Sequence, residues 1–479
     1  MKYFFSYIFI LLNSCLFAQD STFIHVFHAP GNDRSEAMIQ SVNGDFILCG
    51  STSSFDALDT DVHVLRLDGN LNIQWSKHYG QPFVSEKGVD LLEDGEGNLF
   101  VTGYTNATGY DMLLMKISAE GDLLWSLSYG SEDWDFIAAM KFDNAGNLLL
   151  AGHSYAYADL SSQAWLLKCS NDGELLLEVF FGDEGDDSFS DIDTDAEGNI
   201  YLSGTYENSE DNTTTAWTMK CTAQAELIWE QFGLTWREEA FSVSILADRC
   251  FVHGMRTAEG FGESMLDYRY DLDGNYLSSN YFQAEGNTAM TECEIYGDQL
   301  ILSGRQNAFG NGGYDFIYNS QDLSGMYGQA RTTGGNSDDI CTDVVHSNND
   351  KLYFSGYTES FDAIHEDVMV TYSSANVPSP EAIIVLVETD DDFITSVPLY
   401  TYNAIEVYPN PFENNLNLKS PAQLLNVSVE FYSPAGRLIA LLAFKNGENL
   451  DTSELASGTY LYRLFEDGVL IKSGQLIKD

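Results

Sequence analysis

The sequence has 479 residues, too many for one ordinary hydrophobic core, so we expect two folded domains with connecting segments. Aromatic residues make up 13% of the chain and only nine residues are proline, which is typical of a β-rich protein. The 73 acidic and 22 basic residues give a formal net charge of −51. This charge repels phosphate backbones and excludes nucleic acid as a partner; it indicates a strongly solvated exterior, or else cation binding or a saline habitat.

The first segment, residues 1–18, has the pattern of an export signal. Lys2 precedes an apolar run, and a small residue precedes Gln19. The run is too short to span a membrane, and no later segment is apolar enough to do so. Another reading takes Cys15 as a lipoprotein attachment site, although Asn13 fits that pattern poorly.

A stretch at residues 97–105, GNLFVTGYT, recurs with near-constant spacing through three quarters of the chain. Each copy has a turn-forming Gly or Asp, then a short apolar strand, then a second glycine, which we call the marker glycine. The marker glycines are about fifty residues apart and number seven: Gly50, Gly103, Gly152, Gly204, Gly254, Gly304 and Gly356. Fixed-period self-similarity of this length predicts repeated β units that bury their faces against each other.

Each unit contains four strand signals separated by turn signals, so we predict a four-stranded antiparallel meander. Seven such sheets close radially, and the prediction for residues 19–375 is an all-β, seven-bladed β-propeller. The strand at 22–29 precedes the first unit but resembles an outer strand. We expect it to complete the last blade, with residues 382–387 as the other candidate.

Six cysteines follow the signal, at 49, 169, 221, 250, 293 and 341. Two of them, Cys169 and Cys221, occupy equivalent places in successive units, where the separation between blades is too large for a disulfide. We therefore predict free, buried cysteines. No Cys or His spacing suggests a zinc site, and the eight histidines are scattered.

The predicted topology collects the longer loops, which are acidic and aromatic, on one face of the ring. This composition suits sugars or bridging cations, and we select four residues there as candidate ligand-binding residues: Trp134, Asp135, Asp186 and Asp187. The alternating carboxylates Asp191, Asp193 and Asp195 also suggest calcium. However, the following glycine is misplaced for an EF-hand loop, and the segment coincides with an ordinary strand and turn. No cofactor is otherwise expected, and metal binding stays open.

The repeat fails at residues 376–403, where prolines and an acidic run indicate a linker. Residues 404–479 then alternate strand and turn signals and predict a compact β-sandwich. This last domain contains YPNPF at 408–412, FYSPAGRLI, LDTSELASGTYLYRL and a final strand with Lys478.

These motifs resemble the C-terminal sorting domain of type IX secretion cargo in the Bacteroidetes. The positions that carry the resemblance are Tyr408, Pro409, Asn410, Pro411, Gly436, Gly458 and Tyr460. The resemblance implies recognition by the type IX secretion machinery, with the protein secreted or attached to the outer cell surface. The repeats resemble bacterial seven-bladed propeller repeats, which implies no particular function.

Catalytic propeller classes fit the residues poorly. The turns do not match sialidase Asp boxes, the adjacent cysteines of many quinoprotein dehydrogenases are absent, and acidic residues are too abundant to identify a catalytic pair. We therefore expect a binding module for a glycan or a surface protein, not an enzyme. The alternatives are a polysaccharide-processing enzyme using carboxylates on the loop-rich face and a structural component of the envelope.

Overall fold

The computed structural model describes residues 22–28, 31–54, 59–107, 109–131, 133–155, 161–235, 237–258, 262–282, 286–307, 313–325, 327–328, 330–349, 351–360, 366–374, 382–388, 406–408, 412, 415–419, 427–432, 438–443, 450–453, 455–466 and 469–478. The chain divides into two compact units, Met1–Ile394 and Thr395–Asp479. The predicted signal at 1–18 lies outside the described residues. Among those described, no helix could span a membrane.

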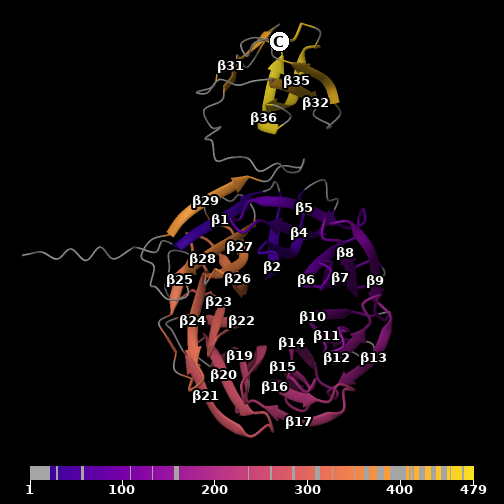
Figure 1. Ribbon diagram of the computed structural model, residues 1–479, viewed down its shortest axis with the longest axis vertical. Helices are drawn as coiled ribbons and strands as arrows, with labels where there is room; N and C mark the ends of the chain where they lie inside the picture. Colours follow the sequence, from indigo (N-terminus) through magenta and orange to yellow (C-terminus); the bar gives the residue numbers. More distant parts are fainter. Residues whose placement is uncertain are drawn as a thin grey trace, which may run out of the picture. The chain divides into compact units, whose positions relative to one another are not determined.

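The first unit contains seven β-sheets that form a ring, as Figure 1 shows. Blades 1 to 3 consist of β2 (Asp33–Gln40), β3 (Phe46–Thr52), β4 (Asp61–Leu67) and β5 (Ile73–Tyr79); β6 (Glu86–Glu93), β7 (Leu99–Thr105), β8 (Asp111–Ile117) and β9 (Leu123–Tyr129); and β10 (Asp135–Phe142), β11 (Leu148–Ser154), β12 (Gln163–Cys169) and β13 (Leu175–Phe181). Blades 4 to 6 consist of β14 (Ser188–Thr194), β15 (Ile200–Asn208), β16 (Thr213–Cys221) and β17 (Leu227–Phe232); β18 (Glu238–Leu246), β19 (Arg249–Ala258), β20 (Gly262–Asp271) and β21 (Tyr276–Phe282); and β22 (Thr288–Tyr296), β23 (Gln299–Gln306), β24 (Asp315–Asp322) and β25 (Arg331–Thr333).

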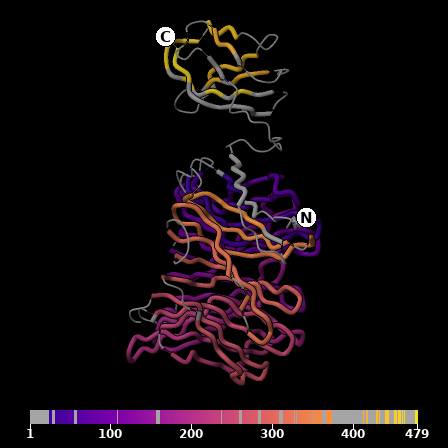
Figure 2. The backbone as a smooth tube through the Cα atoms, turned by 90° about the vertical axis from the view of Figure 1, so that its left-hand side faces the viewer, coloured from indigo at the N-terminus to yellow at the C-terminus, as the bar shows by residue number. Residues whose placement is uncertain are grey.

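Blade 7 joins the two ends of the repeat region. It contains β26 (Asp339–His346), β27 (Lys351–Thr358) and β28 (Asp367–Ser374), with β1 (Thr22–His28) antiparallel to β28 as the fourth strand. The N-terminal strand therefore closes the last blade, as predicted. The rival segment is also a strand, β29 (Ala382–Glu388), but it lies outside β1 and runs parallel to it. Figure 2 shows these strands from the side of the ring.

The inner strands alone confirm seven blades and a closed ring. Each contacts the inner strand of the next blade, in the order β2, β6, β10, β14, β18, β22, β26, and β26 contacts β2 again. Apolar clusters fill the spaces between successive blades; one example contains Ala37, Cys49, Val62, Leu91 and Val101 from blades 1 and 2. The core is therefore distributed around the ring rather than concentrated in one place.

Each marker glycine lies where the second strand crosses a bulge in the inner strand. In all seven blades the glycine pairs with the residue before the bulge, as Gly103 does with Gly88. A Cβ atom on any of these glycines would lie between 1.8 and 2.1 Å from a carbonyl oxygen of the inner strand. Only glycine permits this approach, which explains the repeated residue.

The basic residues that recur in units one to four form ion pairs with the turn between the first two strands. The pairs and their N–O distances are Arg66–Asp45 (2.9 Å), Lys116–Asp94 (3.5 Å), Lys168–Asp143 (2.5 Å) and Lys220–Asp195 (3.3 Å). The six described cysteines are free and buried, as predicted.

The second unit contains two small sheets around one apolar core. One sheet is formed by β30 (Glu406–Tyr408), β31 (Asn415–Lys419) and β34 (Leu450–Asp451), and the other by β33 (Leu438–Ala443), β32 (Val427–Tyr432), β35 (Gly458–Glu466) and β36 (Val469–Lys478). Phe412 and Leu416 pack with Phe431 and Leu464 in that core. The Tyr460 hydroxyl donates to the Ala456 carbonyl at 2.7 Å. Four motif residues lie outside the described ones: Pro409, Asn410, Pro411 and Gly436.

The glycine contact predicts a large difference between two substitutions in one blade. Gly103→Ala should lower the unfolding free energy of the propeller by about 3 kcal/mol or more, because the new methyl group meets the Lys87 carbonyl oxygen. Gly95→Ala, where nothing lies within 4 Å, should change it by less than about 0.5 kcal/mol. Denaturant unfolding followed by tryptophan fluorescence measures both changes. Equal effects of the two substitutions would contradict the proposed close contact at the marker glycine.

Candidate functional site

The loop-rich face carries a continuous group of aromatic rings over blades 2 and 3, which we call the aromatic shelf. It consists of Tyr104, Tyr110, Trp134, Phe136, His153 and Tyr155. Trp134 lies between Tyr110 and Tyr155, with its ring centroid 5.6 Å from Tyr110 and 6.3 Å from Tyr155, both edge-on. The indole is 56% exposed, so an aromatic surface faces solvent and is supported from both sides.

The strands of blades 2 and 3 fix these rings in place. Tyr104 and His153 each follow a marker glycine, so they occupy equivalent positions on β7 and β11. Phe136, on the inner strand β10, stacks between them at 5.3 Å from Tyr104 and 5.2 Å from His153. The backbone N–H of Tyr155 donates to the Trp134 carbonyl at 3.0 Å, which ties the exposed loop residue to the second strand.

Asp135 and Asp187 are buried and hold loop backbone. Asp135 Oδ2 accepts from the Ser131 N–H at 2.6 Å. Asp187 accepts from the N–H groups of Asp183 at 2.9 Å and Glu207 at 3.0 Å. They belong to a repeated position at the start of the inner strand, where six blades have a buried carboxylate: Asp33, Glu86, Asp135, Asp187, Glu238 and Asp339. These two carboxylates therefore have a structural role, because they accept hydrogen bonds from loop backbone. Ligand binding by them stays a prediction.

Asp186 is exposed and lies beside the shelf. Its Oδ1 accepts from the Ser162 N–H at 2.7 Å, and its own N–H donates to Glu207 Oε2 at 2.9 Å. Asp186 and Asp135 both interact electrostatically with His153, whose pKa is nevertheless lowered because burial disfavours the charged imidazole. Of the four candidate residues, Trp134 and Asp186 are therefore the two that are exposed to solvent.

The same face has a charged group at the inner strands of blades 1, 2 and 7. Arg34 donates to both carboxylate oxygens of Glu366 and stacks 4.3 Å from the Tyr357 ring centroid. Glu36 lies between Arg34 and Lys87, and burial raises its pKa despite both cations. The Arg34 guanidinium is therefore already engaged by groups of the protein.

A second set of carboxylates joins neighbouring blades along the inner strands. Asp90 accepts from the Met140 N–H at 2.6 Å, Asp191 from the Val243 N–H at 2.8 Å, and Asp343 from the Met38 N–H at 2.6 Å. All three follow the inner-strand bulge. The neighbouring blade, which donates the N–H, has a small residue at the equivalent position. These residues are Ala139, Ser242 and Ala37. An acidic residue therefore alternates with a small one.

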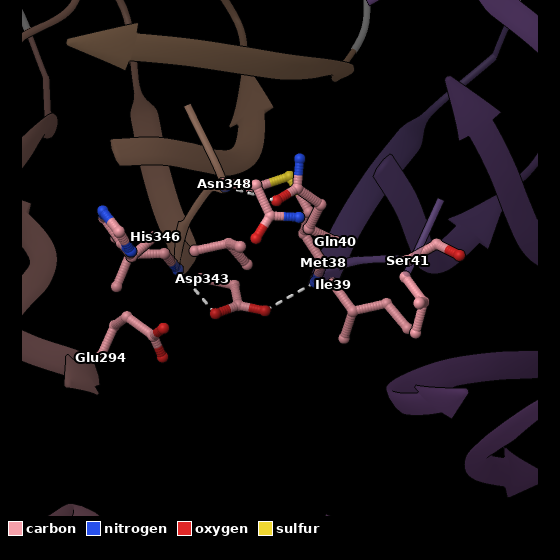
Figure 3. Close-up of a pocket in the computed structure, with 11 residues that line it drawn as sticks. Met38, Ile39, Gln40, Ser41, Glu294, Asp343, His346 and Asn348 are labelled. Carbon is pink, nitrogen blue, oxygen red and sulfur yellow. Dashed lines mark hydrogen bonds between the residues drawn. The ribbon is translucent and has the colours of Figure 1, made fainter. Parts of the chain in front are cut away.

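Seven blades cannot complete an alternation of two residue types, so acidic residues meet at blades 6 and 7. Glu292 occupies this position in blade 6 and Asp343 in blade 7, and burial raises both pKa values well above the usual range. Repulsion from Asp191 and Asp343 adds to the shift of Glu292, and repulsion from Asp90 and Glu294 adds to that of Asp343. Beside them is a pocket of about 650 Å³, shown in Figure 3. Its wall includes Glu294 and Asp343, which lie on the same side of the pocket, and the apolar side chains of Ile39 and Val344.

The segment considered for calcium has protein partners for each carboxylate. Asp191 and Asp193 accept from backbone N–H groups of blade 5, and Asp193 also pairs with Lys141 at 2.9 Å. Asp195 accepts from Asn199 and pairs with Lys220. Across the described part of the chain, no group of three or more His, Cys, Asp or Glu side chains is arranged to hold a metal ion. Asp191 and Asp193 thus join blade 4 to blade 5, and Asp195 stabilises the turn within blade 4.

Sequence reasoning missed most of the shelf and most of the inner carboxylates. A positional signal was available for both. Tyr104 and His153 directly follow marker glycines, while Asp90, Asp191 and Asp343 each precede one by thirteen residues. Equivalent positions of a repeat occupy one level of a ring, so aligning the units would have grouped these residues.

The family comparison decides the role of the second unit. Residues 406–478 match the family described as the secretion system C-terminal sorting domain. The chain carries a type IX secretion sorting domain. The protein is therefore exported by the type IX system and is secreted or attached to the outer cell surface. The sorting domain is its point of interaction with the secretion machinery. No curated protein matches the chain.

The chain is only distantly similar to solved structures. The WD40 domain of Pan2 from Neurospora crassa shares 11% identity, covers 73% of this chain and 91% of its own, and has a TM-score of 0.47. The polysaccharide lyase Uly1 shares 7% identity with coverages of 73% and 91% and a TM-score of 0.45. A putative 6-phosphogluconolactonase from Bacteroides fragilis shares 12% identity, with coverages of 67% and 92% and a TM-score of 0.41. Their activities do not transfer to this chain.

The inner carboxylates predict a pH-dependent effect of Asp191→Asn. Burial raises the pKa of Asp191 to about 7, so its carboxyl group keeps its proton in the folded state over a pH range where the unfolded chain releases it. This contribution to stability is present at low pH and is lost as the pH rises through about 7. The Asn variant should therefore gain stability relative to the wild type between pH 5 and pH 8, measured by denaturant unfolding. A constant or shrinking difference would contradict this.

Proposed function

We propose that the exported propeller binds glycans through the aromatic shelf and does not cleave them. The observation that carries the proposal is the exposed Trp134 indole, supported edge-on by Tyr110 and Tyr155. A sugar ring has an apolar face of C–H groups and a polar rim of hydroxyls. An exposed aromatic face with polar groups at its edge matches both features.

Rigidity supports the same proposal. The indole packs against Tyr110 and Tyr155, the other three rings of the shelf pack against those two, and the Tyr155 backbone fixes the loop that carries the indole. A surface that is already ordered loses little conformational entropy when a ligand binds. Asp186 supplies a carboxylate at the edge of the shelf, where it can accept hydrogen bonds from sugar hydroxyls.

The first test is Trp134→Ala in the full chain. Removing the central ring of a binding surface costs about 2 kcal/mol or more, so the variant should lose about thirty-fold or more in affinity for a bound glycan. A glycan array followed by calorimetry on the best ligand measures this. Leu124→Ala is the matched control, because Leu124 is 52% exposed on the outer strand β9, and it should bind as the wild type does. Unchanged binding by the Trp134 variant would refute the proposal.

A glycan-processing enzyme is the second candidate, and the charged group of Arg34, Glu36 and Tyr357 favours it. A carboxyl group whose pKa is raised beside a cation and a phenol is the kind of arrangement used for acid–base chemistry. We favour binding because the Arg34 guanidinium is already engaged by Glu366 and Tyr357.

The two candidates differ in a direct assay. We expect that the full chain, incubated with a glycan it binds, releases no new reducing ends and no unsaturated sugars over a day. Release of either product, together with its loss in Glu36→Gln, would establish the enzyme and overturn the binding module. The Glu36 variant should otherwise retain glycan affinity, because Glu36 lies outside the shelf.

A further inference from the structure

The charged side chains around the shelf are mostly carboxylates. Asp133 and Asp186 are exposed next to Trp134 and His153 respectively, and Asp135 lies buried beneath them. Asp183 and Glu207 follow on the adjoining loops, where Asp183 accepts from the Tyr206 hydroxyl at 2.6 Å. These carboxylates come from three separate stretches of blades 3 and 4, so the negative charge does not depend on one loop.

The cations near the shelf do not balance these carboxylates. Lys87, on the inner strand of blade 2, has its ammonium 5.9 Å from the Tyr104 ring centroid, whereas Asp186 follows blade 3. The imidazole of His153 packs tilted against Phe136 and edge-on against Tyr155, and burial lowers its pKa, so it stays neutral at neutral pH. The net charge of −51 for the chain adds a long-range field of the same sign.

An anionic sugar placed on Trp134 would bring a carboxylate or sulfate next to the exposed Asp133 and into the negative charge around the shelf. An amino sugar would instead place an ammonium group near those carboxylates. Asp186 is well suited to this contact. Its Oδ1 is engaged by Ser162, whereas its Oδ2 accepts no hydrogen bond from the described residues and faces solvent.

Resting on the glycan-binding function proposed above, we infer that the shelf selects glycans by charge: it takes polysaccharides whose sugars carry protonated amines, and it rejects those built from uronic or sulfated sugars. Trp134 provides the stacking surface and Asp186 the charged contact. The wider negative surface speeds the approach of a cationic polymer and opposes an anionic one.

The test uses three hexasaccharides with the full chain: a glucosamine hexamer, its N-acetylated neutral form and a galacturonic acid hexamer. Calorimetry in mildly acidic buffer, in which the amines are protonated, should rank their affinities in that order, with no detectable binding of the acidic hexamer. Added salt should weaken binding of the glucosamine hexamer more than binding of the neutral hexamer, because salt screens the charged contact.

Two variants, one in blade 3 and one in the loop after it, separate the effect of the carboxylate at the shelf from the effect of the overall negative charge. Asp186→Asn should lower affinity for the glucosamine hexamer by about two- to five-fold and leave the neutral hexamer unchanged. Asp172→Asn removes an exposed carboxylate at the turn between β12 and β13, away from the shelf, and should leave both unchanged. An equal loss for both hexamers in the Asp186 variant would overturn the charged contact.

The remaining outcomes distinguish this inference from the proposed function. If the acidic hexamer binds as tightly as the glucosamine hexamer and Trp134→Ala abolishes that binding, the charge selection is wrong and glycan binding on the shelf stands. If Trp134→Ala leaves binding of every hexamer unchanged, or no hexamer binds at all, both fall.

Discussion

The close contact between each marker glycine and the bulged inner strand is the constraint on which this propeller depends. The second strand can cross the bulge only because it has no side chain there, and the contact occurs once in every blade. It fixes the register of the inner hairpin, and with it the residues that face the next blade. Because β1 pairs with β28, the same register continues through the junction of the two chain ends. The ring is therefore a repetition of one local geometry rather than a single large core.

Both the aromatic shelf and the inner-strand carboxylates follow from this register. The residue after the marker glycine faces the loop-rich side, and in blades 2 and 3 it is aromatic, which places Tyr104 and His153 on either side of Phe136. The residue after the bulge faces the neighbouring blade, where an acidic side chain can accept a backbone N–H. Seven positions cannot alternate evenly, so the surplus carboxylates collect at blades 6 and 7 beside the pocket.

The repeated glycines were sufficient to predict the fold and the blade number, because each reports a local backbone requirement that one sequence can show. The closing strand was predicted from the resemblance of residues 22–29 to an outer strand. The shelf was only half predictable. Trp134 and Asp186 were found from the composition of their loops, but Asp135 and Asp187 carry the same chemistry and are buried under loop backbone. A carboxylate that caps a loop and one that meets a ligand cannot be told apart by residue type. Tyr110 and Tyr155 join the shelf through contacts between blades, which no spacing within one unit reveals.

The sorting domain takes the protein to the cell exterior, and the shelf gives it a surface suited to sugars there. The most direct measurement of this account is a crystal structure of the full chain with a bound glucosamine oligosaccharide. The account predicts a sugar ring stacked on the Trp134 indole, with an amine within hydrogen-bond distance of Asp186. An oligosaccharide seated in the pocket between blades 6, 7 and 1, with the Trp134 indole uncovered, would contradict it.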